Sequence, residues 1–294
     1  MVMTPRRILA ATDFSDTAER ARRAALILAR GFDADLHVLH VRVLLDDPHL
    51  EEEHRVEIER LRQAADDEER DALHPSESDP EVTVEVHLAR GLDVAEVVRE
   101  SSSELGCDLI VMGTHGRRGV GHLLLGSVAE KVIRTAPAPV MTVHRNARLP
   151  ENGVGRILVA HDFSEQSSFA VRVAGGWARA LGAAITLIHV VEPVVYPEFY
   201  SVDLLPDEMI TRIRNRSREA LESTAAEYLH DVPCRVEVFT GKAGESIVAA
   251  AARDDIDLAV IGTRGLSAVE NLLLGSVAES VMRQCPVPLL AVRG

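Results

Sequence analysis

The residue types best suited to bind an anion occur in a spaced glycine pattern that appears twice. The pattern Gly113-x2-Gly116-x9-Gly126-Ser127 returns 149 positions later as Gly262-x2-Gly265-x9-Gly275-Ser276. Glycines lack a Cβ, so the backbone can turn sharply and approach a ligand closely. A Gly-Ser pair at a helix start adds free N–H groups, the positive end of the helix dipole and a hydroxyl. Each copy therefore predicts a phosphate-binding loop.

A second set of repeated residues lies where buried strands are predicted to end. The same offset relates Asp13 to Asp162 and His40 to His189. In an open parallel sheet, ligands bind beyond the carboxyl ends of the strands. The residues predicted at such ends are Asp13, Val41 and Gly113 in the first half, and Asp162, Val190 and Gly262 in the second. We expect each trio to converge on one site.

The elements that must position these residues alternate between strand and helix. Apolar runs and period-two alternation predict strands at 6–11, 36–41, 82–88, 108–112 and 139–143, and again at 156–160, 184–191, 234–239, 258–261 and 288–292. Helical patterns are predicted at 17–30, 51–73, 91–105 and 127–134, and at 165–181, 207–229, 244–253 and 276–284. This alternation predicts an α/β fold of two tandem, doubly wound, five-stranded parallel-sheet domains. The predicted domains are 1–147 and 152–294.

Composition restricts the class of partner. The chain has 294 residues, 46% of them hydrophobic, and a formal net charge of −14. That charge argues against a general nucleic-acid or anionic-membrane surface, although backbone N–H groups can still bind a phosphate locally. No apolar run approaches the ~20 residues of a membrane span, and a strand is predicted too close to the first residue to leave room for a signal peptide. We therefore expect a cytoplasmic protein.

Several competing motifs are missing from the sequence. It has no GxxxxGK[ST] loop, and its twelve histidines show no HExxH spacing. Cys107 and Cys285 flank buried strands and are interpreted as packing residues. Lys242 follows a predicted strand and could reach a phosphate, but a solvated surface lysine is the favoured interpretation. No catalytic residue and no protein ligand for a metal is predicted.

Both halves resemble the universal stress protein family, in its tandem two-domain form. The glycine pattern followed by Ser-Val-Ala-Glu, and the Asp-Phe-Ser turns at 13–15 and 162–164, carry the resemblance over nearly the whole chain. It implies a Rossmann-like fold of the adenine nucleotide α-hydrolase kind that binds ATP, with Mg2+ bridging the phosphates. By resemblance, Asp13 and the Val41 backbone would contact adenine and Gly113 would lie near the ribose. The phosphates would meet Gly116, Gly126, Ser127 and Val128. The same roles would fall to Asp162, Val190, Gly262, Gly265, Gly275, Ser276 and Val277.

Three functions stay open at this point. The favoured one is an ATP-binding regulator of the stress response, with little or slow hydrolysis. The alternatives are a nucleotide-independent dimeric scaffold and a slow ATPase or adenylyl-transfer enzyme. The two sites are expected to differ, because His161 replaces Thr12 and Leu266-Ser267 replaces Arg117-Arg118.

The assembly follows from the repeat. Single-domain relatives dimerise, often through the last strand, so the halves are expected to pack as an internal pseudo-dimer. The strands at 140–143 and 289–292 would then lie side by side, and two chains could still form a homodimer. Residues 194–205 have no counterpart in the first half and could cover the second site, form an interface or pack on their own domain.

Overall fold

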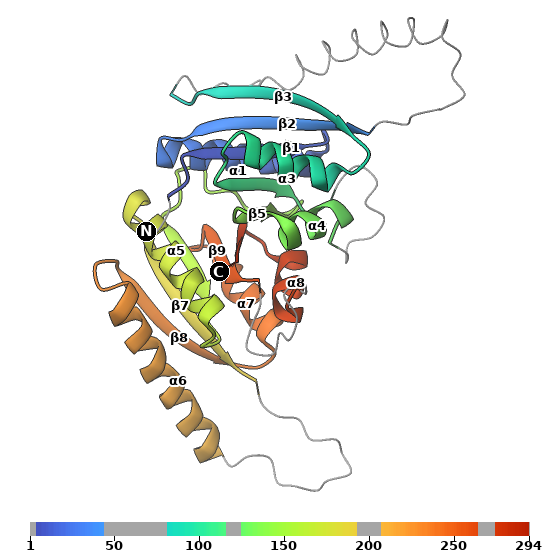
Figure 1. Cartoon of the computed structure of the whole chain (residues 1–294). Helices are drawn as coiled ribbons and strands as arrows, with labels where there is room; N and C mark the ends of the chain where they lie inside the picture. The colour runs from blue at the N-terminus through green and yellow to red at the C-terminus, as the bar shows by residue number, and fades with distance from the viewer. Residues whose placement is uncertain (1–3, 44–80, 116–124, 193–206, 264–273, 294) are drawn as a thin grey trace, which may run out of the picture.

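One continuous ten-stranded sheet organises the molecule (Figure 1). The computed structural model describes residues 4–43, 81–115, 125–192, 207–263 and 274–293. The helix predicted at 51–73 and the segment 194–205 lie outside these ranges. The strand order is β3-β2-β1-β4-β5-β10-β9-β6-β7-β8. Each half thus contributes five strands in the same order, as the sequence predicts.

The bounds of the elements agree closely between the halves. The first half contains β1 (Arg7–Thr12), α1 (Asp16–Phe32), β2 (Asp35–Val43), β3 (Val84–Gly91), α3 (Val94–Glu104), β4 (Leu109–Gly113), α4 (Ser127–Thr135) and β5 (Val140–Val143). The second contains β6 (Arg156–Ala160), α5 (Glu165–Leu181), β7 (Ala184–Val191), α6 (Asp207–Tyr228), β8 (Cys234–Thr240), α7 (Ala243–Ala251), β9 (Leu258–Gly262), α8 (Ser276–Gln284) and β10 (Leu289–Val292).

One boundary corrects the sequence-based prediction. A helix was expected to open at Gly91, but β3 continues to that residue, because Gly91 still pairs with Val43 of β2. The helix begins only after Asp93, whose carboxylate accepts hydrogen bonds from the backbone N–H groups of Ala95 and Glu96. An aspartate cap is a stronger start signal than a glycine at this point.

The two halves join through their last strands, as predicted. All strand pairs within each half are parallel, whereas β5 and β10 pair antiparallel with Met141 opposite Leu290. All four residues of each of these strands are buried. The pairing removes two edges that would otherwise carry open N–H and C=O groups.

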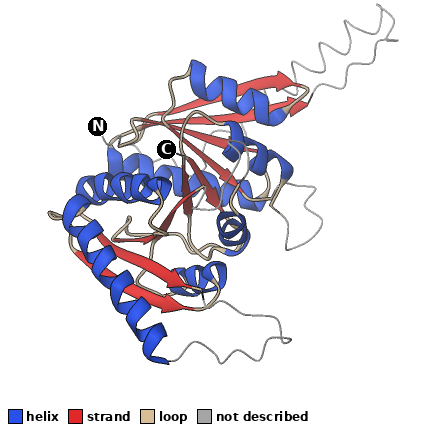
Figure 2. Ribbon diagram, turned by 60° about the horizontal axis from the view of Figure 1, so that its bottom comes forward, coloured by secondary structure: helices blue, strands red, loops and turns tan. Residues whose placement is uncertain are grey.

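The helices cover both faces of the sheet (Figure 2). Helices α1, α5 and α6 contribute buried residues to one core cluster, and α3, α4, α7 and α8 contribute to the other. On the first face, α1 and α5 meet across the boundary between the halves. There Phe32 packs edge-on against the buried Trp177, with ring centroids 5.0 Å apart. Each described helix is too short or too polar to cross a membrane.

Candidate functional site

The turn after β1 is built around Asp13. The Ser15 backbone N–H and hydroxyl both donate to Asp13 Oδ1, over 3.1 and 2.6 Å. Ser15 Oγ in turn accepts from the Ala18 N–H and caps α1. Phe14 between them adopts φ 61°, a left-handed conformation unusual for a bulky residue. Asp13 therefore has a structural role that the sequence did not reveal, because it holds the residue that caps the helix.

The second half repeats this turn with one exchange. Ser164 donates from its N–H and its hydroxyl to Asp162 Oδ1, and Phe163 has φ 66°. In the first half the Phe14 N–H donates to Thr12 Oγ1 over 3.0 Å. In the second half the Phe163 N–H donates to His161 Nδ1 over 3.2 Å. A threonine hydroxyl and a histidine nitrogen thus serve as equivalent acceptors, but only the histidine can titrate.

His161 is therefore held in its neutral form. Burial lowers the pKa of His161 to about 4, which outweighs the opposing effect of Asp162. Because Nδ1 accepts a hydrogen bond, the ring hydrogen must lie on Nε2, which is 3.3 Å from Ser168 Oγ. Protonation of Nδ1 would place its N–H against the N–H of Phe163, and the hydrogen bond that holds the turn would be lost.

A histidine braces each turn from the neighbouring strand. His40 Nδ1 lies 2.8 Å from the Thr12 carbonyl oxygen, and His189 Nδ1 lies 2.8 Å from that of His161. A carbonyl oxygen can only accept, so Nδ1 donates in both pairs. The phenylalanine of each turn packs against the imidazole. The ring centroids are 4.6 Å apart for Phe14 and His40, and 4.5 Å apart for Phe163 and His189. The sequence marked both histidines only through their shared offset.

The described residues that are predicted to contact the phosphates lie at the starts of α4 and α8. Gly126 and Gly275 are the N-cap residues, and as glycines they offer no side-chain hydrogen bond to the first N–H groups of their helices. The Gly126 N–H donates to the Thr114 carbonyl and the Gly275 N–H to that of Thr263. Ser127 and Ser276 are exposed there, as is Val277. Helix starts of this kind can accept an anion from solvent.

The glycines do not all serve a ligand. A Cβ on Gly126 would lie 2.8 Å from the Thr114 carbonyl oxygen, so the loop-to-helix turn itself requires glycine. A Cβ on Gly113 would lie 2.8 Å from the Thr17 side chain and 3.2 Å from its backbone. Gly113 is therefore needed for close packing of α1 against β4. The sequence suggested only approach to a ribose for this residue.

A pocket of about 280 Å³ opens at the carboxyl ends of β6, β7 and β9. It has the start of α8 on one side and the start of α7 on the other. Six of the seven site residues predicted in the second half line it: Asp162, Val190, Gly262, Gly275, Ser276 and Val277. His161, His189 and Glu192 line it too and were missed as site residues. The seventh predicted residue, Gly265, lies outside the described residues.

The first half places its counterparts on the corresponding elements. Asp13 follows β1, Val41 is buried near the end of β2, and Gly113 ends β4. Gly126, Ser127 and Val128 form the start of α4. Gly116 and the arginines at 117 and 118 lie outside the described residues. The predicted difference in basicity between the two loops therefore stays a prediction.

The two cysteines and the lysine that the sequence analysis set aside as site candidates lie where it expected them. Cys107 and Cys285 are buried, and burial raises the pKa of each thiol to about 12. Lys242 is largely exposed, and its Nζ pairs with Glu245 over 2.9 Å. Neither cysteine is a candidate nucleophile, and Lys242 is a surface lysine paired within its own helix.

Comparison with known proteins agrees with this architecture. The family described as "Universal stress protein family" matches residues 4–144 and again 153–293. A universal stress protein of Thermus aquaticus is 35% identical over 47% of this chain and 97% of its own length. A universal stress protein of Mycobacterium tuberculosis is 27% identical over 74% of this chain and 71% of its own length.

A solved structure shows the same fold. The crystal structure of a universal stress protein from Archaeoglobus fulgidus superposes with a TM-score of 0.66 at 22% identity, covering 99% of both chains. The repeat seen in the glycines, the strand order and the turns thus coincides with two matches to one family. The chain belongs to the universal stress protein family and carries two of its domains in tandem.

Proposed function

We propose that this protein is an adenine-nucleotide-binding regulator that takes up ATP with Mg2+ and hydrolyses it slowly or not at all. The observation that carries the proposal is the shared pocket. Asp162 and Val190 line it together with Gly275, Ser276 and Val277, although these residues come from three separate parts of the chain. Its volume of about 280 Å³ is close to the ~300 Å³ lower bound of small-molecule sites, which favours a ligand as small as a nucleoside.

The start of α8 supports a phosphate on the same ligand. Its first N–H groups have no side-chain cap, and the exposed Ser276 adds a hydroxyl donor. In a chain of net charge −14 these local donors must overcome a repulsive field. A divalent ion on the phosphates would reduce that repulsion, so Mg2+ suits this site as part of the ligand. Here it would be held by the phosphates.

The residues near the pocket support binding more than catalysis. His161 stays neutral and is occupied by the Phe163 N–H, and Asp162 holds Ser164. Lys242 is paired with Glu245. Each of these groups already has a structural partner, which disfavours a role as general base. We therefore expect conformation or partner choice to follow nucleotide occupancy.

The domain boundary proposed between 147 and 152 has support in the contacts of two arginines. The Arg20 side chain bonds to the Ala147 carbonyl within the first half. The Arg148 backbone N–H donates to Pro286, and its guanidinium to Arg253 and Ile256 of the second half. Ala147 is therefore bonded to the first half, whereas the next residue, Arg148, is bonded to the second half.

A nucleotide-independent scaffold is the second candidate. The observation that favours it is the pairing of β5 with β10, which joins the halves as an internal pseudo-dimer through backbone hydrogen bonds and buried side chains. Further association into a homodimer would use surfaces other than these strands. The two functions differ in one measurable property, which is bound nucleotide.

The first test is to denature freshly purified protein and to quantify the released nucleotide per chain by chromatography. Two ATP per chain would support both sites, and one would support unequal sites. AMP in place of ATP would favour an enzyme. No released nucleotide, with no binding of added Mg-ATP, would contradict the proposal and favour the scaffold.

Matched serine variants assign the site. Ser276→Ala and Ser127→Ala each remove one donor to a charged phosphate, a loss that weakens binding by about tenfold or more at that site. Ser103→Ala is the control, because Ser103 is an exposed serine of α3 whose hydroxyl donates to the Arg99 carbonyl of the same helix. Equal affinity in all three variants would contradict the assigned phosphate positions.

A further inference from the structure

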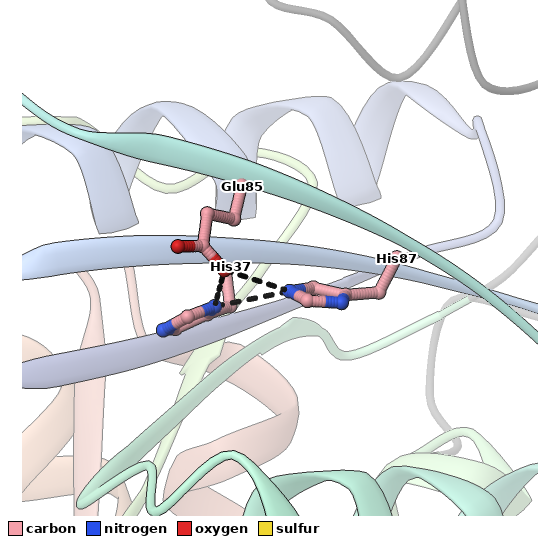
Figure 3. Close-up of side chains that lie close together, drawn as sticks. All are labelled: His37, Glu85 and His87. Carbon is pink, nitrogen blue, oxygen red and sulfur yellow. Dashed lines mark hydrogen bonds and ion pairs between the residues drawn. The ribbon is translucent and has the colours of Figure 1, made fainter.

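Three side chains of types that can bind a metal ion converge on β2 and β3, the outer strands of the first half (Figure 3). His37 comes from β2, and Glu85 and His87 come from β3. His37 Nδ1 lies 3.0 Å from His87 Nε2 and 3.5 Å from Glu85 Oε2, and the last two atoms are 3.8 Å apart. Each residue thus places one potential ligand atom close to those of the other two.

The sheet register explains the convergence. His37 pairs directly with Glu85, and His87 pairs with Leu39, two residues further along β2. Side chains two apart on a strand point to the same face. His37, Glu85 and His87 therefore share one face of the sheet, although 48 residues separate the first two in the chain.

The second half shows what these positions hold when they form only a structural network. Thr186 corresponds to His37 by the repeat and pairs with Arg235, and Glu237 occupies the place of His87. Arg235 donates to Thr186 Oγ1 over 3.2 Å and pairs with Glu237 over 2.8 Å. Donor and acceptors therefore satisfy one another there. In the first half the arginine is absent, and the cluster contains two imidazoles, which share one hydrogen bond, and a carboxylate.

We propose that His37, Glu85 and His87 bind a divalent transition-metal ion of the Zn2+ class through His37 Nδ1, Glu85 Oε2 and His87 Nε2, with the fourth position open to water. Ligand atoms about 2.0 Å from a tetrahedral zinc ion lie about 3.3 Å from one another. The three observed separations are each within about half an ångström of that value. Two imidazoles and one carboxylate are a donor set that zinc accepts.

The surroundings of the cluster fit this role. The His37 side chain is almost fully buried, at 7% exposure, which fixes its position. The Glu85 side chain is 58% exposed, which leaves a path for the ion from solvent.

A bound ion would act on the edge of the sheet. Among the described residues, β3 is the outermost strand at its end of the sheet and pairs with β2. Ligands from both strands would join them through the metal, in addition to the backbone hydrogen bonds. A site of this kind stabilises the folded state by mass action, so the melting temperature should rise with zinc concentration.

The test uses untagged full-length protein freed of metal with a chelator, titrated with Zn2+ or Co2+ against a chromophoric competitor. We expect one saturable equivalent in the wild type, with the visible absorption of four-coordinate Co2+. His87→Gln should weaken it by at least tenfold, since even loss of a group that only orients a ligand costs 10- to 100-fold. Binding would also be lost in His37→Thr/Glu85→Arg/His87→Glu, which copies the self-paired network of the second half.

His230→Gln is the matched control, because His230 is an exposed histidine of the second half and should keep full affinity. No saturable binding by the wild type at micromolar metal would overturn the proposal. So would unchanged affinity in both His87→Gln and the triple variant. The test does not depend on nucleotide, so its outcome is independent of the ATP proposal.

Discussion

At the scale of single residues, the same turn is held by different chemistry in the two halves. Thr12 and His161 both accept the N–H of a phenylalanine with positive φ. Only His161 changes its hydrogen-bonding capacity with pH, and burial already lowers its pKa to about 4. Of the two turns, the one in the second half is therefore expected to be acid-sensitive.

The variant His161→Thr tests this expectation. The folded-state pKa lies below the ordinary 6.5, so the unfolded chain takes up the proton first and stability falls as pH drops from 6.5 to about 4. The full effect is about 3 kcal/mol. Denaturant unfolding at several pH values should show a flatter profile in His161→Thr. Parallel profiles for variant and wild type would contradict the assignment.

At the scale of elements, the helix starts are of two kinds, one with a serine N-cap and one with a glycine N-cap. The N-caps Ser15 and Ser164 close the starts of α1 and α5, whereas α4 and α8 begin at glycines and keep their N–H groups without a side-chain cap. Gly126 is fixed by the Thr114 carbonyl rather than by a ligand. Gly126 is therefore required by the loop-to-helix turn itself. The helix start is exposed because this turn places it at the surface.

Gly126→Ala should therefore affect both stability and binding. Its Cβ would meet backbone at 2.8 Å, an overlap that costs about 1–3 kcal/mol if the loop must move. Thermal unfolding and nucleotide affinity should both decrease. Gly155→Ala is the control, since its Cβ would meet the Asp257 carboxylate at 3.4 Å, an ordinary contact distance. A wild-type melting temperature in Gly126→Ala would show that the turn tolerates a side chain.

At the scale of the whole molecule, the halves depend on each other. The strands β5 and β10 are fully buried where they pair, and Phe32 of α1 covers Trp177 of α5. The Arg293 guanidinium also donates to the Arg134 carbonyl across the boundary. Separation would expose an unpaired, apolar strand edge on each half.

Separate fragments 1–147 and 152–294 are accordingly expected to self-associate, or to recombine when mixed. Sedimentation of each fragment and of the mixture would measure this. The fluorescence of Trp177, the single tryptophan of the chain, should shift on recombination because Phe32 covers it again. Two soluble, stable monomers would contradict an obligatory pseudo-dimer.

The sequence by itself determined the repeat and the α/β class. These follow from local patterns, because apolar periodicity and glycine spacing act within a short window of the chain. The pairing of the last strands was expected from the family resemblance rather than from any local pattern, and the site at the strand ends stays a prediction. The bounds of one outer strand and of the helix that follows it were predicted incorrectly. Gly91 ended a strand rather than opening a helix, since pairing with Val43 outweighed its local preference.

Only the tertiary structure decided which distant side chains meet. Asp13 holding Ser15, Gly113 against Thr17, Phe32 against Trp177, and His37 facing Glu85 and His87 all depend on register and packing between elements. The period-two pattern of a strand fixes its two faces but not its alignment with a neighbour. A shift by one residue would have sent Glu85 and His87 to the other face, away from His37.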